Sequence, residues 1–262
     1  MNWLARLRAW HEARTVARFA IADPLWAAVE RHYPFIGQRS AADRAELRRL
    51  VSLFLARKEF SGAHGLVVTD AMAVAIAAQA CLPVLHLGLS AYDGFVGIVV
   101  HPGAAVARRE VRDEAGLVHQ YDEPLAGEAM AGGPVMLNWP DVAAAGASAA
   151  NGYNVVIHEF VHVLDMAHGL ADGYPVALPA AQRARWAQVM RRSYGRLRHM
   201  VNAGVEPWLD AYGAQAPEEF FAVAAESFFV SPHTLRHHDE ALYEVLADYF
   251  QQDPAAVLTY AV

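Results

Sequence analysis

Apolar side chains recur every three or four residues along much of this chain, which is the spacing of helices that bury one face. The first two segments with this pattern also carry many arginines and glutamates, so we expect amphipathic helices there. Ser40 is a preferred N-cap residue type, and Pro217 suits a first helical turn. The predicted helices cover residues 1–20, 41–58, 70–79, 180–200, 217–230 and 239–250.

Strand signals cluster in the middle of the chain. Residues 95–101 are short and β-branched, and residues 134–139 form a second extended run between turn residues. We expect residues 117–121 to pair with residues 95–101. These strands precede a central apolar segment, and helices follow it. The order predicts an α+β fold, mostly helical, with a small mixed sheet beside the central helix.

The length of 262 residues allows one large domain or two small ones. The small-residue segment 143–150 is too short to establish a domain boundary. We therefore expect a single domain over residues 1–262, with a helical N-terminal part at about residues 1–90 and a core at about residues 91–262.

Composition narrows the classes of partner. The net charge of −7 gives no general attraction to nucleic acid, so no direct nucleic-acid partner is expected. Charged or turn residues interrupt every apolar run before it reaches about 18 residues, and arginines interrupt the N-terminus. This pattern predicts no membrane span and no secretory signal. Cys81 is the single cysteine, which excludes an intrachain disulfide and suits a cytoplasmic location.

The central apolar segment, residues 154–165, carries the most informative motif, His158-Glu159-x-x-His162. On a helix, residues four apart share a face, so His158 and His162 can bind one metal ion. Glu159 lies beside them, where a carboxylate can act as the base for a water molecule. The alternative is a buried helix with two hydrogen-bonded histidines, and it carries a heavy desolvation cost that a metal would offset. The motif therefore predicts zinc-assisted hydrolysis.

A catalytic zinc generally has three protein ligands, and two residues compete to be the third. His168 lies ten residues after His158, the spacing of His-Glu-x-x-His-x-x-Gly-x-x-His peptidases. That motif needs glycine at a sharp turn, where this chain has Asp165. The rival is Glu219, because it and Glu226 lie seven apart on one face of an otherwise apolar helix. The residues alone favour Glu219 without excluding His168.

Four further residues have candidate roles in the site. Tyr212, seven residues before Glu219, can donate a hydrogen bond to an oxyanion or be an ordinary half-buried tyrosine. Asp165 and Glu226 can orient a ligand imidazole or take part in structural ion pairs. An aminopeptidase also needs a carboxylate for the free amine of its substrate, and Glu226, Asp165 and Asp210 all remain open for that role.

Segments around these residues resemble the Mlc titration factor A family of bacterial zinc peptidases. The segments that carry the resemblance are residues 77–83, 133–140, 154–165, 208–212, 218–223 and 252–254. The catalytic part also resembles the catalytic domain of anthrax lethal factor. Both resemblances imply a zincin-like metallopeptidase with one Zn²⁺ per chain, held by His158, His162 and Glu219. Glu159 is the implied general base, and Tyr212 is the implied catalytic tyrosine.

The family resemblance further implies aminopeptidase-like hydrolysis of peptides and association with an Mlc-like transcriptional repressor of sugar uptake. A second hypothesis belongs to another class: a regulatory protein-binding factor whose zinc site is latent or structural. The chain retains every side chain that hydrolysis needs, which favours the enzyme. A third hypothesis is a metzincin-like protease in which His168 is the third ligand.

Overall fold

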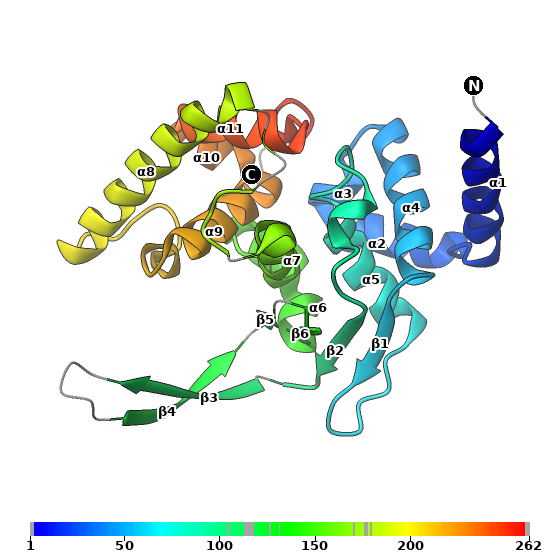
Figure 1. Ribbon diagram of the computed structural model, residues 1–262, viewed down its shortest axis with the longest axis horizontal. Coiled ribbons are helices and arrows are strands. Elements are labelled where there is room, and N and C mark those ends of the chain that lie inside the picture. The colour runs from blue at the N-terminus through cyan, green and yellow to red at the C-terminus, as the bar shows by residue number, and fades with distance from the viewer. Residues whose placement is uncertain are drawn as a thin grey trace.

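The computed structural model describes residues 3–103, 105–112, 118–125, 127–130, 132–169, 171–175, 178 and 180–259. Most of them are helical. The helices are α1 (Trp3–Arg18), α2 (Asp23–His32), α3 (Pro34–Gly37), α4 (Ala41–Leu55), α5 (Asp70–Cys81), α6 (Trp139–Ser148), α7 (Val155–Asp165), α8 (Ala180–Asn202), α9 (Pro217–Val230), α10 (Pro232–His238) and α11 (Glu240–Phe250). Figure 1 shows α1 to α5 on one side of the molecule and α8 to α11 on the other, with α7 between them. Within the described ranges, no helix combines the length and the apolar character needed to cross a bilayer.

Several helices begin where local signals predict. At the start of α4, Ser40 accepts a hydrogen bond from the Asp43 amide at 3.0 Å. At the start of α5, Thr69 accepts one from the Met72 amide at 3.3 Å. These side chains satisfy amides that lack a partner within the helix. Pro217 occupies the first turn of α9, where its missing N–H removes no helical hydrogen bond.

Four short strands form a mixed sheet in the order β1–β2–β6–β5. The strands are β1 (Glu59–Gly62), β2 (Gly97–His101), β6 (Val135–Asn138) and β5 (Gly127–Ala129). β1, β2 and β6 run parallel, and the edge strand β5 is antiparallel to β6. The predicted fold class is confirmed. β1 falls within the part of the chain that we expected to be helical, so the sheet joins both parts. The single-domain organisation stays a prediction.

A separate antiparallel hairpin consists of β3 (Ala105–Arg112) and β4 (Val118–Leu125), and it extends away from the helices in Figure 1. The predicted pairing of residues 117–121 with residues 95–101 is wrong. Residues 118–121 pair with residues 109–112, and residue 117 lies outside the described ranges. An extended pattern indicates a strand but does not indicate which strand it pairs with. Pairing with a nearby segment closes a shorter loop and therefore costs less entropy.

Candidate metal site

Two histidine side chains one turn apart on α7 begin the site. The helix starts after Asn154, whose Oδ1 accepts a hydrogen bond from the Ile157 amide at 2.9 Å. The Nε2 atoms of His158 and His162 are 3.1 Å apart. Their side chains are only 11% and 12% exposed, because α7 packs against α5, α9 and β5. The central helix thus presents two imidazoles from one buried face.

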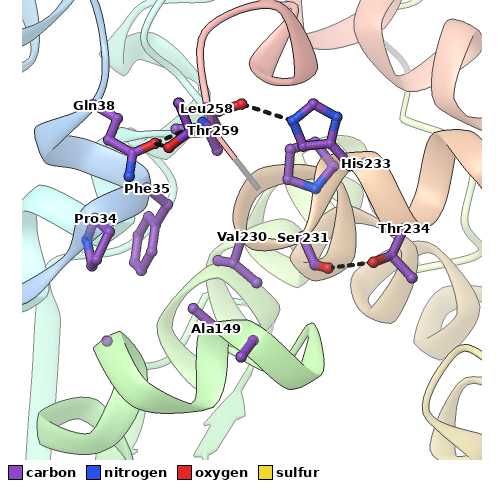
Figure 2. Close-up of a pocket in the computed structure, with 13 residues that line it drawn as sticks. Pro34, Phe35, Gln38, Ala149, Val230, Ser231, His233, Thr234, Leu258 and Thr259 are labelled. Carbon is purple, nitrogen blue, oxygen red and sulfur yellow. Dashed lines mark hydrogen bonds between the residues drawn. The ribbon is translucent and has the colours of Figure 1, made fainter. Parts of the chain in front are cut away.

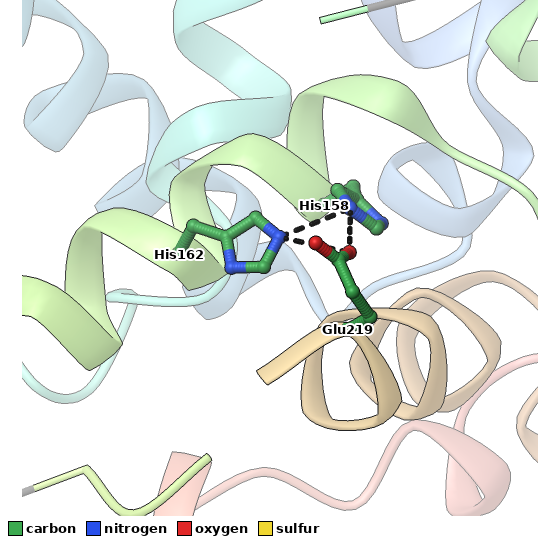
Figure 3. Close-up of side chains that lie close together, drawn as sticks. All are labelled: His158, His162 and Glu219. Atoms are coloured by element: carbon green, nitrogen blue, oxygen red, sulfur yellow. Dashed lines mark hydrogen bonds and ion pairs between the residues drawn. The ribbon is translucent and has the colours of Figure 1, made fainter. Parts of the chain in front are cut away.

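Glu219, in the first turn of α9, reaches across to both histidines (Figure 3). Its Oε2 lies 3.1 Å from His158 Nε2 and 3.2 Å from His162 Nε2. Tetrahedral zinc with ligand bonds of 2.0–2.2 Å holds its ligand atoms about 3.3 Å apart. The three observed separations match one face of that tetrahedron, so this donor set fits zinc. Across the described part of the chain, His158, His162 and Glu219 are the group of side chains that could hold a metal ion.

Opposite charges alternate through this cluster. Burial works to lower the pKa of His158, but the carboxylates of Glu226, Glu219 and Glu159 outweigh it and raise the pKa well above its usual value. Burial works to raise the pKa of Glu219, but hydrogen bonds with His158 and His162 lower it to about 2. A divalent cation would replace the histidine protons in this environment.

Glu159 stands beside the cluster, in the wall of a cavity of about 200 Å³. The cavity lies between β5, α7, the start of α9 and the short helix η4 (Ala211–Ala214). Glu159 is 5% exposed, and this burial raises its pKa to about 7 despite the opposing effect of His158 and His162. A carboxyl group with this pKa can both accept and release a proton near neutrality, as a general base must.

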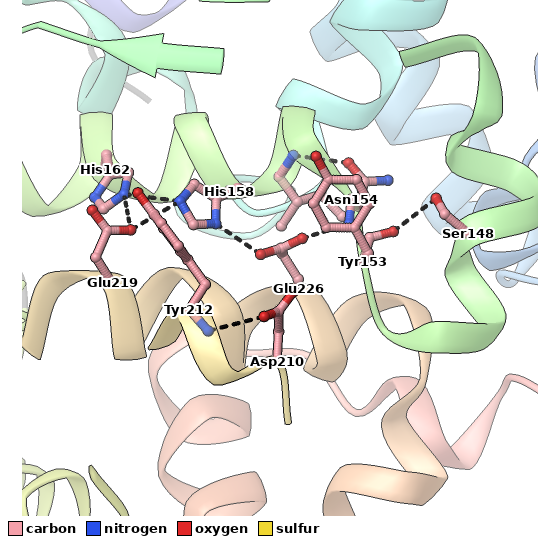
Figure 4. Close-up of polar contacts among 10 residues, drawn as sticks. Ser148, Tyr153, Asn154, His158, His162, Asp210, Tyr212, Glu219 and Glu226 are labelled. Carbon is pink, nitrogen blue, oxygen red and sulfur yellow. Dashed lines mark hydrogen bonds and ion pairs between the residues drawn. The ribbon is translucent and has the colours of Figure 1, made fainter. Parts of the chain in front are cut away.

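Tyr212 lines the same cavity from η4. Its ring centroid lies 5.9 Å from that of His158, and the residue is 37% exposed. Asp210 begins η4 by accepting a hydrogen bond from the Tyr212 amide at 2.9 Å. Figure 4 shows the phenol directed toward the imidazoles and Glu219. The phenol therefore borders the cavity beside the cluster.

Two other carboxylates that the sequence brought forward have hydrogen-bond partners of their own. Glu226 Oε1 lies 2.7 Å from His158 Nδ1, on the side of the ring away from the cluster. Asp165 Oδ2 accepts a hydrogen bond from the Gly173 amide at 2.7 Å, and burial raises its pKa to about 6. Among the described lining residues, the cavity includes none of Glu226, Asp165 and Asp210. None of the three candidates for holding a substrate amine is therefore a wall residue of this cavity.

The rival ligand His168 belongs to the short helix η3 (Met166–His168) that follows α7. Its side chain lies outside the described residues. The structure therefore places Glu219 beside the two histidines. The His168 imidazole stays outside the described part of the chain.

Sequence reasoning missed the edge strand that faces the cavity. Gly127 and Glu128 of β5 line it, together with Glu218 of α9. A Cβ atom at residue 127 would lie only 2.6 Å from Cγ of Glu159, so glycine allows β5 to approach Glu159 this closely. A strand of three residues has no periodicity that would reveal it. A negative charge in the first turn of a helix is favourable in itself, so sequence analysis did not assign Glu218 to the cavity.

This chain is similar to a known protein family and to several known proteins. The model of the glucose-regulated metallo-peptidase M90 family matches residues 7–251. Mlc titration factor A from Serratia proteamaculans is 36% identical over 225 residues, which cover 84% of this chain and 85% of that protein. Mlc titration factor A from Klebsiella pneumoniae is 33% identical over 224 residues, covering 84% and 83%. An uncharacterized protein from Synechocystis is 34% identical over 247 residues, covering 94% and 89%. The matched range contains the whole cluster.

Proposed function

This chain belongs to the glucose-regulated metallo-peptidase M90 family, and we propose that it is a zinc-dependent peptidase with aminopeptidase-like activity. One observation carries the proposal. Two imidazole nitrogens and a carboxylate oxygen converge at zinc-ligand spacing on the wall of a cavity that Glu159 also faces. We propose His158, His162 and Glu219 as the ligands of one Zn²⁺.

The proposed chemistry divides among few side chains. When bound, zinc would supply Lewis acidity, lowering the pKa of water toward ~7 and polarising a peptide carbonyl. Glu159 accepts the proton of the attacking water and returns it to the leaving amine. Tyr212 donates a hydrogen bond to the carbonyl oxygen as negative charge develops on it. Glu226 holds the His158 ring through Nδ1, which keeps Nε2 directed at the cluster.

The names of the relatives favour a second candidate, a regulatory factor that binds an Mlc-like transcriptional repressor. In that case the zinc site would be latent or structural. Structural zinc sites are closed by four protein ligands, whereas the described residues bring three ligands to a cavity. This difference supports the peptidase, which can also bind a repressor. The likeness to anthrax lethal factor and the cytoplasmic location stay predictions.

Hydrolysis of amino-acid anilides by the zinc-loaded protein tests the peptidase. We expect turnover that a chelator abolishes and added zinc restores. Glu159→Gln should lower kcat by about 10²–10⁴-fold while zinc content stays at the wild-type level, because Glu159 is not a proposed ligand. Unchanged turnover in this variant would refute the mechanism. Repressor binding without any hydrolysis by the wild type would instead favour the regulatory factor.

A further inference from the structure

A row of buried polar groups leads away from His158, and Figure 4 shows its first members, Glu226 and Asn154. Glu226 Oε1 lies 2.7 Å from His158 Nδ1, and Glu226 Oε2 accepts a hydrogen bond from the Asn154 amide at 2.5 Å. The side chain of Asn154 continues the row, because its Nδ2 donates to Gln79 Oε1 at 2.8 Å. Gln79 Nε2 donates in turn to the Ala75 carbonyl at 3.2 Å. We refer to these contacts as the Gln79–Asn154–Glu226 row.

The row is enclosed by protein and connects three helices. Gln79 and Asn154 are 0% exposed, and Glu226 is 2% exposed. Gln79 stands on α5, Asn154 precedes α7, and Glu226 stands on α9. Buried polar groups are unfavourable unless they are paired, and here the pairing runs unbroken to the imidazole. Packing does not explain a glutamine on α5, because the other residues that α5 buries are alanines and other apolar side chains.

The contacts in the row determine which nitrogen of His158 faces the cluster. Asn154 Oδ1 is occupied by the Ile157 amide, so Nδ2 is the group that faces Gln79. One oxygen of Glu226 is occupied by the Asn154 amide, and the other accepts a hydrogen bond from Nδ1–H of His158. Nε2 then carries the lone pair that a metal ligand requires.

We propose that Gln79 and Asn154 are positioning residues for the metal centre and act on His158 through Glu226. The inference rests on the proposed zinc site. Neither residue is among the described lining residues of the cavity, so neither is placed to touch a substrate there. Losing the Gln79 contact loosens the residue whose backbone amide holds Glu226, so the carboxylate and the imidazole gain freedom to move. Zinc binding then has to restrict that motion, which lowers the zinc affinity.

The zinc affinity of the full chain, measured by competition with a chromogenic chelator, tests this inference. Gln79→Met approximately conserves side-chain volume but removes the hydrogen bonds of the amide. We expect it to weaken zinc binding about 10-fold, and Glu226→Gln to weaken it about 10–100-fold. Gln252→Met is the matched control. Gln252 is 7% exposed, and its amide also makes two hydrogen bonds, with Arg39 and with Leu82, neither of which belongs to the row. Gln252→Met should therefore leave the zinc affinity within twofold of the wild-type value.

Equal zinc affinities for Gln79→Met and Gln252→Met would overturn the inference. If Gln79→Met fails to fold, Asn154→Ser gives the same test, because serine keeps the N-cap of α7 but lacks the amide that bonds Gln79. Where both single variants fold, the double variant should bind zinc no more weakly than the weaker single variant, because both changes break one link. A wild-type protein that binds zinc but hydrolyses nothing would refute the proposed function. It would not contradict the inference about the Gln79–Asn154–Glu226 row.

Discussion

A methyl group added at Gly127 would collide with Glu159. A Cβ atom at this position would lie 2.6 Å from Cγ of Glu159, 2.7 Å from Oε1 and 2.9 Å from Cδ. Favourable contacts between such atoms lie at about 3.5–4.0 Å. In Gly127→Ala, therefore, the Glu159 side chain and β5 must separate by about 1 Å.

A displacement of this size has a calculable effect on the proposed reaction. Misplacing a reacting group by about 1 Å can cost about 10²-fold in rate, so we expect kcat/KM of Gly127→Ala to fall about 10²-fold. The three atoms approached belong to a side chain, which can rotate away more cheaply than backbone. Overpacking usually lowers the free energy of unfolding by about 1–3 kcal/mol, and we therefore expect a loss near the lower end of that range. Zinc content should not change, because none of these atoms belongs to a proposed ligand.

Anilide hydrolysis, metal analysis and urea unfolding of one preparation check the three parts of this prediction. Gly195→Ala on α8 is the control, because a Cβ atom there meets nothing within 4 Å. Its turnover should equal that of the wild type, and its stability should rise by about 0.5–1 kcal/mol, since glycine is disfavoured inside helices. Wild-type kcat/KM in Gly127→Ala would refute the reasoning that the position of Glu159 limits the reaction.

Other substitutions separate roles within the site from roles in the fold. Tyr212→Phe should lower kcat by about 10²–10³-fold with little change in KM, because the O–H is needed only as negative charge develops on the carbonyl oxygen. A rise in KM alone would indicate a role in substrate binding instead. Glu219→Ala should lose zinc and His168→Ala should keep it in metal analysis, and the reverse result would favour the metzincin-like hypothesis. Asp239→Ala removes the N-cap of α11 and the acceptor that lies 2.6 Å from the Ser193 hydroxyl. In urea titration its free energy of unfolding should fall by about 1–3 kcal/mol, while an altered zinc affinity would contradict a purely structural role.

The helices around the site were predictable because their signals are local. The apolar run of α7 follows an N-cap residue, and α9 begins at a proline, so sequence spacing alone places both elements. The pairing of His158 with His162 follows from helical geometry. The approach of Glu219 is less direct, because it lies 57 residues beyond His162 and depends on how α9 packs on α7. The residues alone therefore left His168 as an alternative.

Strand pairing could not be predicted in the same way, because it joins segments whose partners the local pattern does not name. β5 has only three residues, and its place depends on contacts with β6 and α7. The importance of Gly127 is therefore visible only when β5 lies against Glu159. From its sequence neighbours, this glycine is indistinguishable from one in an ordinary turn.

The rotation of α7 about its own axis is set by packing on the face opposite His158 and His162. Phe160 is two residues from both His158 and His162, so it points about 200° around the helix from each of them. It is 0% exposed, and its ring lies 5.7, 5.2 and 5.7 Å from those of Phe54, Tyr92 and Phe95. A helix held by such a close-packed aromatic cluster cannot turn its histidines away from α9 without disrupting that packing. Among the described residues, the group that could hold a metal comes from α7 and α9 alone, so the residues before 96 help to orient the proposed ligands and add none.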